Sequence, residues 1–384
     1  MEQSGTLMSA QIQFLDTRLS LIHIPLHLYA YFVQPILQLL LPAEGEEPNI
    51  ASNGLGGDHS SSTWTIQHPF VNISLTPIEC SVVCSRESAK ELFVPVLEGL
   101  DRATREQIAI SKEDYVVFQV DGEGLDAGQR VLELTTPLAM AGISIFFITT
   151  YFSDYILVPL KSRGQVIHAL EDRGFAFEKS AEAFVNQSHH RNTSSSSSFD
   201  PVPPSTPPPT TISELQVRTF ALLKRRNIVP RVNSDIRLVQ CAGRRDTFSD
   251  KTGVKEAKLH LGLIKCLVNR PRFLSVTLTD SEAASLLLEQ RLLPQFGSDE
   301  VLLGSKEDVI IPVTLDLRQL PLEATGIVCG VAGRLVGGTS EQLRDPVEMS
   351  YLSTARAGTV MVAEGELDRA MGALRGTENG FSRD

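Results

Sequence analysis

The sequence predicts an α+β protein built from four βαββαβ units that are arranged as two pairs. The main observation is an internal repeat, because residues 145–170 align without a gap with residues 349–374, and Ile148 then corresponds to Leu352. Each copy reads as a strand, a polar turn, a second strand and a helix, and residues 73–92 carry a weaker third copy. A repeat of this kind indicates that one small structural unit is used several times.

Length and composition fit four small units. The 384 residues would make units of about 70–80 residues each, and a hydrophobic content of 42% is enough to build their cores. Stretches rich in Ser, Gly, Pro and Thr cannot bury enough apolar surface to fold, so they mark linkers and insertions. The predicted organisation, in chain order, is a first unit at 14–98 with a loop insertion at 46–63, a second unit at 112–179, a linker at 180–211, a third unit at 212–298 with a loop insertion at 244–257, a fourth unit at 307–376 and a tail at 377–384.

The first unit contains a segment that raises the question of a membrane span. Residues 19–41 lack charged side chains and are long enough to cross a bilayer. The run contains prolines and histidines, its first part alternates as a strand does, and residues 30–41 read as an apolar helix. We therefore expect a strand, a turn and a helix with no membrane span, followed by strands at 65–75 and 80–84.

The remaining units are predicted from apolar runs and from helix-start signals. An N-cap signal at Asp280 or Ser281 predicts a helix in the third unit. The expected elements are a strand at 114–119 and a helix at 127–141 in the second unit, strands at 214–217, 237–241, 260–268 and 273–278 and a helix at 281–295 in the third, and a strand at 309–313 and a helix at 327–335 in the fourth.

Charge and motif content argue against several classes of function. Lys and Arg total 35 against 46 Asp and Glu, a net charge of −11, which disfavours binding to nucleic acid or to anionic membranes. The five cysteines are odd in number and show no metal-ligand spacing, so we expect reduced thiols, no metal and a cytoplasmic protein. No nucleophile, zinc or phosphate-loop motif is recognisable, so we expect neither an enzyme nor a cofactor.

The βαββαβ order of paired units resembles that of ACT domains, which have a ferredoxin-like fold. The resemblance is closer to the CASTOR family of cytosolic amino-acid sensors, and the residues that carry it are 141–145, 148–158, 324–328 and 352–354. With polar insertions such as 337–346, the chain resembles a diverged, fungal-like member of that family. The resemblance implies a non-enzymatic sensor that acts through protein–protein interaction in TOR nutrient signalling.

By the same resemblance, an amino acid binds between the second and fourth units. Ser144 and Ile145 would hold its carboxylate, and the residues around its side chain would be Gly326, Ile327, Thr354 and Ala355. A helix is expected just after Gly326, and the free N–H groups and dipole at a helix N-terminus suit a carboxylate. Two structural explanations stay open, namely Ser144 as the cap of a turn and Gly326 as an ordinary glycine at a helix entry.

The sequence departs from the arginine-sensing members of the family at two charged positions. In those members an acidic residue lies two positions before the Gly-Ile pair and contacts the guanidinium, whereas Ala324 takes that position here, between Glu323 and Thr325. An aspartate that binds the ligand amine in those members is replaced by Gly358. Glu323, Thr325 and Gly358 stay candidate site residues, and the ligand is arginine, a smaller or neutral amino acid, or absent.

The turn of the second unit corresponds to the partner-binding surface of the family, with Tyr151, Phe152 and Asp154 as its candidate residues. The implied partner is a large regulatory complex of the TOR pathway, and the structural alternative is a turn packed against the neighbouring unit. Exposed sheet edges of the first and third units would allow a homodimer. Two other functions stay open: a regulatory subunit or remnant of an amino-acid metabolic enzyme, and a constitutive interaction module without a ligand.

Overall fold

The structure is a computed structural model that describes residues 11–41, 69–121, 126–177, 209–244, 254–297, 300–336 and 346–375. The chain divides into two compact bodies, which we call body A (Met1–Asp16, Tyr115–Ser234 and Ile310–Asp384) and body B (Thr17–Asp114 and Asp235–Val309). The insertion predicted at 46–63 and the tail at 377–384 lie outside the described residues, as do residues 180–208, 245–253 and 337–345 of the linker and of the other insertions.

Body A contains two segments of βαββ order, each followed by a helix. The first segment consists of β5 (Tyr115–Asp121), α5 (Ala127–Met140), β6 (Phe146–Thr149), β7 (Ser153–Pro159), η3 (Leu160–Ser162), α6 (Arg163–Glu171) and the short strand β8 (Ala176–Phe177). The second consists of β14 (Ile310–Asp316), α10 (Ile327–Val336), β15 (Met349–Ser353), β16 (Ala357–Ala363), η5 (Glu364–Glu366) and α11 (Leu367–Arg375). The first part of β1 (Gln11–Ile24), α8 (Ile212–Arg225) and β9 (Arg231–Val232) complete the body.

The strands of body A form a sheet in the order β1–β5–β7–β6–β15–β16–β14–β9, and β8 pairs with the start of β1. In each βαββ segment the third strand therefore lies between the first and the second. The two segments meet edge to edge through their second strands, β6 and β15. This order places the two copies of the sequence repeat side by side in one sheet.

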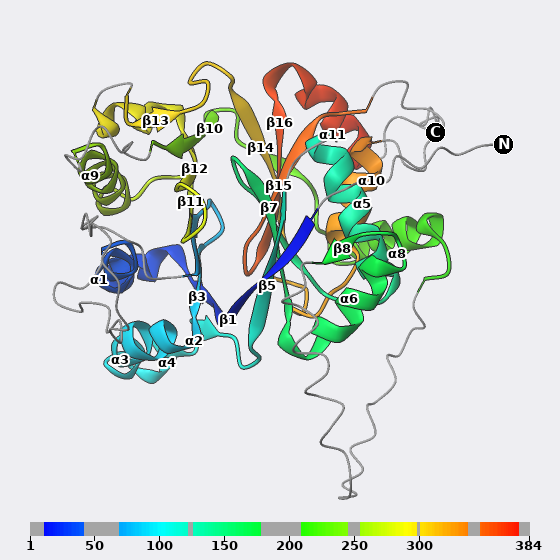
Figure 1. Cartoon of the computed structure of the whole chain (residues 1–384), viewed down its shortest axis with the longest axis horizontal. Helices are drawn as coiled ribbons and strands as arrows, with labels where there is room; N and C mark the ends of the chain where they lie inside the picture. Colours follow the sequence, from blue (N-terminus) through cyan, green and yellow to red (C-terminus); the bar gives the residue numbers. More distant parts are fainter. Residues whose placement is uncertain are drawn as a thin grey trace, which may run out of the picture. The chain divides into compact units, whose positions relative to one another are not determined.

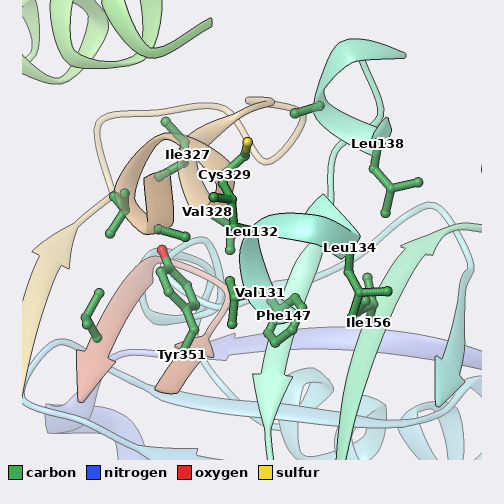
Figure 2. Close-up of a cluster of buried hydrophobic side chains, with 14 of the residues drawn as sticks. Val131, Leu132, Leu134, Leu138, Phe147, Ile156, Ile327, Val328, Cys329 and Tyr351 are labelled. Atoms are coloured by element: carbon green, nitrogen blue, oxygen red, sulfur yellow. The ribbon is translucent and has the colours of Figure 1, made fainter. Parts of the chain in front are cut away.

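The helices α5, α6, α8, α10 and α11 cover one face of this sheet (Figure 1). Their apolar residues recur every three or four positions, as Val131, Leu134 and Leu138 do in α5, which turns one face of the helix toward the strands. Figure 2 shows side chains of α5 and α10 meeting those of Phe147 and Tyr351 from the strands. The helices α5 and α10 also pack against each other, and the candidate site lies beside this contact.

Body B repeats the same order with different sequence. Its first segment consists of the second part of β1, η1 (Leu26–Leu28), α1 (Tyr29–Leu40), β2 (Phe70–Leu75), β3 (Cys80–Ser85), α2 (Arg86–Ser88), η2 (Ala89–Phe93), α3 (Val94–Glu98), α4 (Arg102–Arg105) and β4 (Ala109–Ile110). Its second segment consists of β10 (Leu238–Gly243), α9 (Val254–Val268), β11 (Leu274–Thr279), β12 (Ser285–Glu289), η4 (Gln290–Phe296) and β13 (Leu302–Leu303).

The sheet of body B runs β13–β10–β12–β11–β2–β3–β1, with β4 beside β1. Here too the second strands of the two segments meet, because β2 and β11 pair from Leu75 with Leu274 to Phe70 with Thr279. These are strands of the first and third predicted units. They pair with each other within one chain, and a homodimer through other sheet edges of these units stays a prediction.

Residues 19–41 fold as the sequence predicts, with the end of β1, the turn η1 and the helix α1. Within the described residues, no helix combines the length and the apolar character that a membrane span requires. The elements predicted for the second and fourth units are also confirmed, including α5, α10 and both copies of the repeated strand-turn-strand-helix.

The secondary structure predicted for the third unit is wrong in three places. Residues 214–217 belong to the helix α8, in which Leu215, Thr219 and Leu223 are buried at a spacing of four. Residues 260–268 belong to α9, and the predicted helix at 281–295 is instead the strand β12 followed by the 3-10 helix η4. The expected N-cap is a turn, in which the N–H of Glu282 donates to the Thr279 hydroxyl at 3.0 Å.

The pairing of the predicted units also differs from their order along the chain. The first and third units lie together in body B, and the second and fourth lie together in body A. Residues 212–234, predicted as the start of the third unit, belong to body A. The reason is packing, because α8 lies against α10 of the fourth unit.

Candidate functional site

Repeat-related residues face each other where β6 meets β15. The register pairs Ile148 with Leu352, the same two residues that correspond in the sequence repeat. Two antiparallel strands related by a twofold rotation pair in this way, because a residue on the axis faces its own counterpart. The two βαββ segments of body A are therefore related by a local pseudo-twofold axis at this seam.

Hydrogen bonds across the seam follow the same symmetry. The N–H of Phe147 donates to the Ser353 hydroxyl at 3.0 Å, and the N–H of Tyr351 donates to the Thr149 hydroxyl at 3.1 Å. Phe147 corresponds to Tyr351 and Thr149 to Ser353 in the repeat, so the two bonds are counterparts. Thr149 and Ser353 thus have a structural role, since each satisfies a buried backbone donor.

Two adjoining hollows lie beside the start of α10, between the two segments of body A. The first is lined by Thr135, Ala139, Ile143, Ile145, Ala324, Gly326, Ile327, Val328 and Cys329. The second has an empty volume of about 460 Å³, its open mouth included, and is lined by Ile145, Phe146, Leu317, Leu320, Pro321, Leu322, Ala324, Ile327, Val328, Tyr351, Ser353, Thr354, Ala355 and Ala357. Four of these residues line both hollows, so the two form one continuous candidate site.

The lining is mostly apolar and includes no Asp, Glu, Lys or Arg side chain. Its side-chain hydroxyls belong to Thr135, Tyr351, Ser353 and Thr354. Three of them already take part in hydrogen bonds, because Thr135 donates to the Val131 carbonyl at 2.7 Å, Ser353 accepts from Phe147, and Thr354 lies 3.4 Å from the Ala357 carbonyl. An apolar hollow with few placed polar groups is typical of a small-molecule site.

Tyr351 is a lining residue of the candidate site that sequence reasoning missed. Its side chain is 1% exposed, yet its hydroxyl makes no hydrogen bond to any described residue. Figure 2 shows its ring extending from β15 toward α10, with the oxygen on the side of that helix. Burial raises the pKa of Tyr351 above its usual value, so the hydroxyl stays protonated and can donate a hydrogen bond. The repeat held a signal for it, because Phe147 takes the corresponding place.

Gly358 lies directly beside this hydroxyl. It is a residue of β16 that pairs with Ser353 and Leu315, and a Cβ atom at this position would lie 2.4 Å from the oxygen of Tyr351. Gly358 therefore leaves room for the tyrosine hydroxyl. Position 358 therefore carries no charged group.

The first turn of α10 forms one wall of the site. Gly326 precedes it with a φ of +78°, a left-handed conformation that favours glycine. A Cβ atom at Gly326 would lie 2.7 Å from the Leu215 side chain, and one at Gly330 would lie 2.7 Å from Thr219, so these glycines face α8. Gly326 thus has a structural reason to be glycine, and its neighbours Ile327 and Val328 are the residues that turn to the site.

The predicted ligand residues are only partly brought together. Ile145, Gly326, Ile327, Thr354 and Ala355 line the candidate site. The other candidates do not line it: Ser144, which is buried between Ile143 and Ile145, the exposed Glu323, the half-buried Thr325, and Gly358 in its strand. Within the described parts of the chain the Ser144 hydroxyl makes no hydrogen bond, so it does not cap a turn there.

The predicted exposure of Asp154 is corrected by the structure. Its carboxylate is 0% exposed and accepts a hydrogen bond from Arg130 Nε at 2.9 Å, so it lies inside body A. Burial raises the pKa of Asp154, and the guanidinium of Arg130 opposes that rise. A buried carboxylate needs such a partner, which is the physical reason for its position.

Tyr151 and Phe152, by contrast, are surface residues. They are 38% and 41% exposed, and their rings meet edge to face at a centroid distance of 4.9 Å. They occupy the turn between β6 and β7, where the sequence predicted a partner-binding surface. Their role in binding a partner stays a prediction.

Possible metal ligands and cysteine thiols are the remaining reactive side chains of the described structure. Its described residues include no group of three His, Cys, Asp or Glu side chains that would hold a metal ion. All five cysteines are free and buried. Burial raises the pKa of the Cys84 thiol to about 12 and that of Cys266 to about 11, which keeps these thiols protonated.

A sequence-family model described as an ACT domain matches residues 110–172. The matched range covers β5 to α6, the first βαββ segment of body A with its second helix. An ACT domain thus provides one wall of the candidate site, and it supports an ACT-domain regulatory protein with the potential to bind an amino acid. A comparison with curated proteins gives no significant match.

Several solved structures resemble parts of the chain. Aspartate kinase from Synechocystis has 10% identity and a TM-score of 0.31, over 97% of this chain and 57% of that chain. The ligand-free regulatory subunit of aspartate kinase from Thermus thermophilus has 13% identity and a TM-score of 0.25, over 41% of this chain and 94% of that one. A protein from Agrobacterium tumefaciens has 17% identity and a TM-score of 0.26, over 44% of this chain and 92% of that one. Overlaps of this size establish neither fold nor function for this chain.

Proposed function

We propose that the chain is a non-enzymatic amino-acid sensor built from four ACT-like units, with its ligand between the second and fourth units. The observation that carries the proposal is the apolar site at the first turn of α10, whose opposite wall belongs to the matched ACT domain. The first-turn N–H groups and the helix dipole supply a place for an α-carboxylate. Ile145, Thr354 and Ala355 would contact the rest of the ligand.

The chemistry of the lining favours a neutral amino acid over arginine. A buried guanidinium requires an acidic partner, and neither lining includes one. Glu323, the acid nearest in sequence to the Gly-Ile pair, is exposed and does not line the site. The apolar wall formed by Leu317, Leu320 and Pro321 suits an aliphatic side chain.

The second step of the proposal is a change in protein–protein interaction. The exposed pair Tyr151 and Phe152 lies in a turn that begins one residue after β6, a strand of the same seam. Aromatic side chains of this kind are common anchors of interfaces. By resemblance to the CASTOR family, the partner would be a cytoplasmic regulatory complex of TOR nutrient signalling.

Thermal unfolding of the whole chain with each of the twenty amino acids tests the ligand step. A ligand present at 100 times its dissociation constant raises the free energy of unfolding by about 2.7 kcal/mol, which shifts the midpoint measurably. We expect one or more amino acids with aliphatic side chains to raise the midpoint, and arginine to leave it unchanged. If none of the twenty amino acids raises the midpoint, the sensor proposal fails and a constitutive interaction module takes its place.

A further inference from the structure

The pseudo-twofold axis relates two pairs of residues that differ in a coordinated way. On one side, Phe147 lies on β6 and Asp154 lies on the neighbouring strand β7, where it pairs with Thr149 and binds Arg130. On the other side, the corresponding residues are Tyr351 on β15 and Gly358 on β16. One side thus has an apolar ring and a charged carboxylate, and the other has a ring with a hydroxyl and no side chain at all.

The hydroxyl of Tyr351 takes the space that a side chain at position 358 would need. The two groups exclude each other, because a Cβ atom on Gly358 would lie 2.4 Å from the Tyr351 oxygen. At these corresponding positions the first segment therefore has the carboxylate of Asp154, whereas the second has the neutral hydroxyl of Tyr351. Phe147 shows that the same fold packs well with a ring that lacks the hydroxyl.

A nearly buried hydroxyl that makes no hydrogen bond to the protein destabilises the fold, because it loses most of its hydrogen bonds to water. Among the described residues none bonds to the Tyr351 hydroxyl, although the ring lines the larger hollow. Phenylalanine would avoid this cost at the same position. The arrangement is accounted for if the hydroxyl gains its partner when a ligand enters the hollow.

We propose that Tyr351 determines ligand specificity by donating a hydrogen bond to the α-carboxylate of a neutral amino acid. This inference rests on the proposed function and names the group that recognises the ligand. The first-turn N–H groups of α10 would bind the same carboxylate from the helix side. The ligand's aliphatic side chain would then lie against Leu317 and Leu320, and a cationic side chain would find no partner.

Calorimetric titration of the whole chain with L-leucine, L-valine and L-arginine tests this assignment. L-leucinamide, in which the carboxylate is replaced by a neutral amide, serves as a fourth probe. Tyr351→Phe should weaken binding of the two aliphatic amino acids by about 10- to 150-fold, the range of one hydrogen bond to a charged group. The wild-type chain should bind L-leucinamide much more weakly than L-leucine and should not bind L-arginine.

Tyr29→Phe is the matched control. Tyr29 is also fully buried, but its hydroxyl donates to the Leu267 carbonyl at 2.9 Å within body B. We expect Tyr29→Phe to lower the midpoint of thermal unfolding and to leave ligand affinity unchanged. Tyr351→Phe should show the opposite pattern, with unchanged or higher stability in the absence of ligand.

The results separate this inference from the proposal beneath it. If the aliphatic probes bind the wild type and Tyr351→Phe equally well, Tyr351 does not recognise the ligand and the inference is overturned, while the sensor proposal stands. Tighter binding of L-arginine than of L-leucine would also overturn it. If none of the probes binds the wild type and no other amino acid stabilises it, both fail together.

Discussion

Glu289 is a buried carboxylate that holds several groups of body B at once. It is 1% exposed, accepts two hydrogen bonds of 2.7 Å from the guanidinium of Arg291, and accepts the backbone N–H groups of Arg272 at 2.8 Å and Phe273 at 3.2 Å. Burial by itself raises the pKa of Glu289, but the hydrogen bonds from Arg291 and from the two amides outweigh burial and lower it. The charged form of Glu289 therefore stabilises the folded state.

Glu289→Gln is expected to lower the free energy of unfolding at neutral pH by about 1–2 kcal/mol. The estimate is modest because the two arginines are about half exposed and water screens them. Since the folded-state pKa is lowered, the contribution is present above the unfolded-state value of about 4.3 and is lost as the pH falls through the folded-state value. Urea unfolding at a series of pH values measures the difference between the two chains.

Glu106→Gln provides the control for that comparison. Its carboxylate and its partner Arg102 are both exposed, at 64% and 92%, so the substitution should change stability very little at any pH. A wild-type chain and a Glu289→Gln chain that differ by the same amount at pH 3 and at pH 7 would contradict the role assigned to this carboxylate.

The predictability of single residues depends on how far away their partners lie. Ile327 and Ala355 were predicted as site residues from a family resemblance, and they line the candidate site. Asp154 was predicted to be exposed, but it is buried and binds Arg130, which lies 24 residues away in sequence. Tyr351 was missed because an aromatic residue in an apolar strand looks like part of the core, and its unpartnered hydroxyl is visible only in three dimensions.

At the scale of the elements, the seam between β6 and β15 is what brings the two halves of the site together. The reciprocal hydrogen bonds at Ser353 and Thr149 satisfy the backbone donors that the short β6–β15 pairing places there. Because the seam places Ile145 opposite α10, its stability and ligand binding should be linked.

Ser353→Ala should lower the free energy of unfolding by about 1–3 kcal/mol, because it leaves the N–H of Phe147 buried without an acceptor. Chemical denaturation of the whole chain measures this loss of free energy of unfolding. Ser350→Ala is the matched control on the same strand, since Ser350 is only half-buried and should cost much less. Equal effects of the two substitutions would show that the seam hydroxyls do not stabilise the sheet.

Elements were predictable where the sequence carries a clear period or an internal repeat. α10 and both copies of the repeated strand-turn-strand-helix follow from the sequence alone. The segment 260–268 was predicted as a strand because short apolar runs do not distinguish a strand from a helix. In the structure Leu259, Leu263 and Cys266 are buried on one face of α9, a spacing of four and three that indicates a helix.

At the scale of the whole molecule, the chain folds its first predicted unit with its third and its second with its fourth. Repeats in the sequence indicate how many units to expect, but they do not say which edges pair. That choice depends on contacts between residues far apart in the chain, such as Leu352 with Ile148 and Leu274 with Leu75. The expected ligand site between the second and fourth units nevertheless falls within a single body.

The central claim is that the hollow at the first turn of α10 binds an amino acid. Ala324 lines both parts of that hollow, so Ala324→Phe should fill it. Ala363→Phe is the matched control, because Ala363 is exposed at the end of β16.

Calorimetric titration of the three chains with the amino acid that stabilises the wild type most is the most direct test. The account predicts one ligand per chain for the wild type and for Ala363→Phe, and no measurable binding for an Ala324→Phe chain that still unfolds cooperatively. Undiminished binding by the folded Ala324→Phe chain would contradict it.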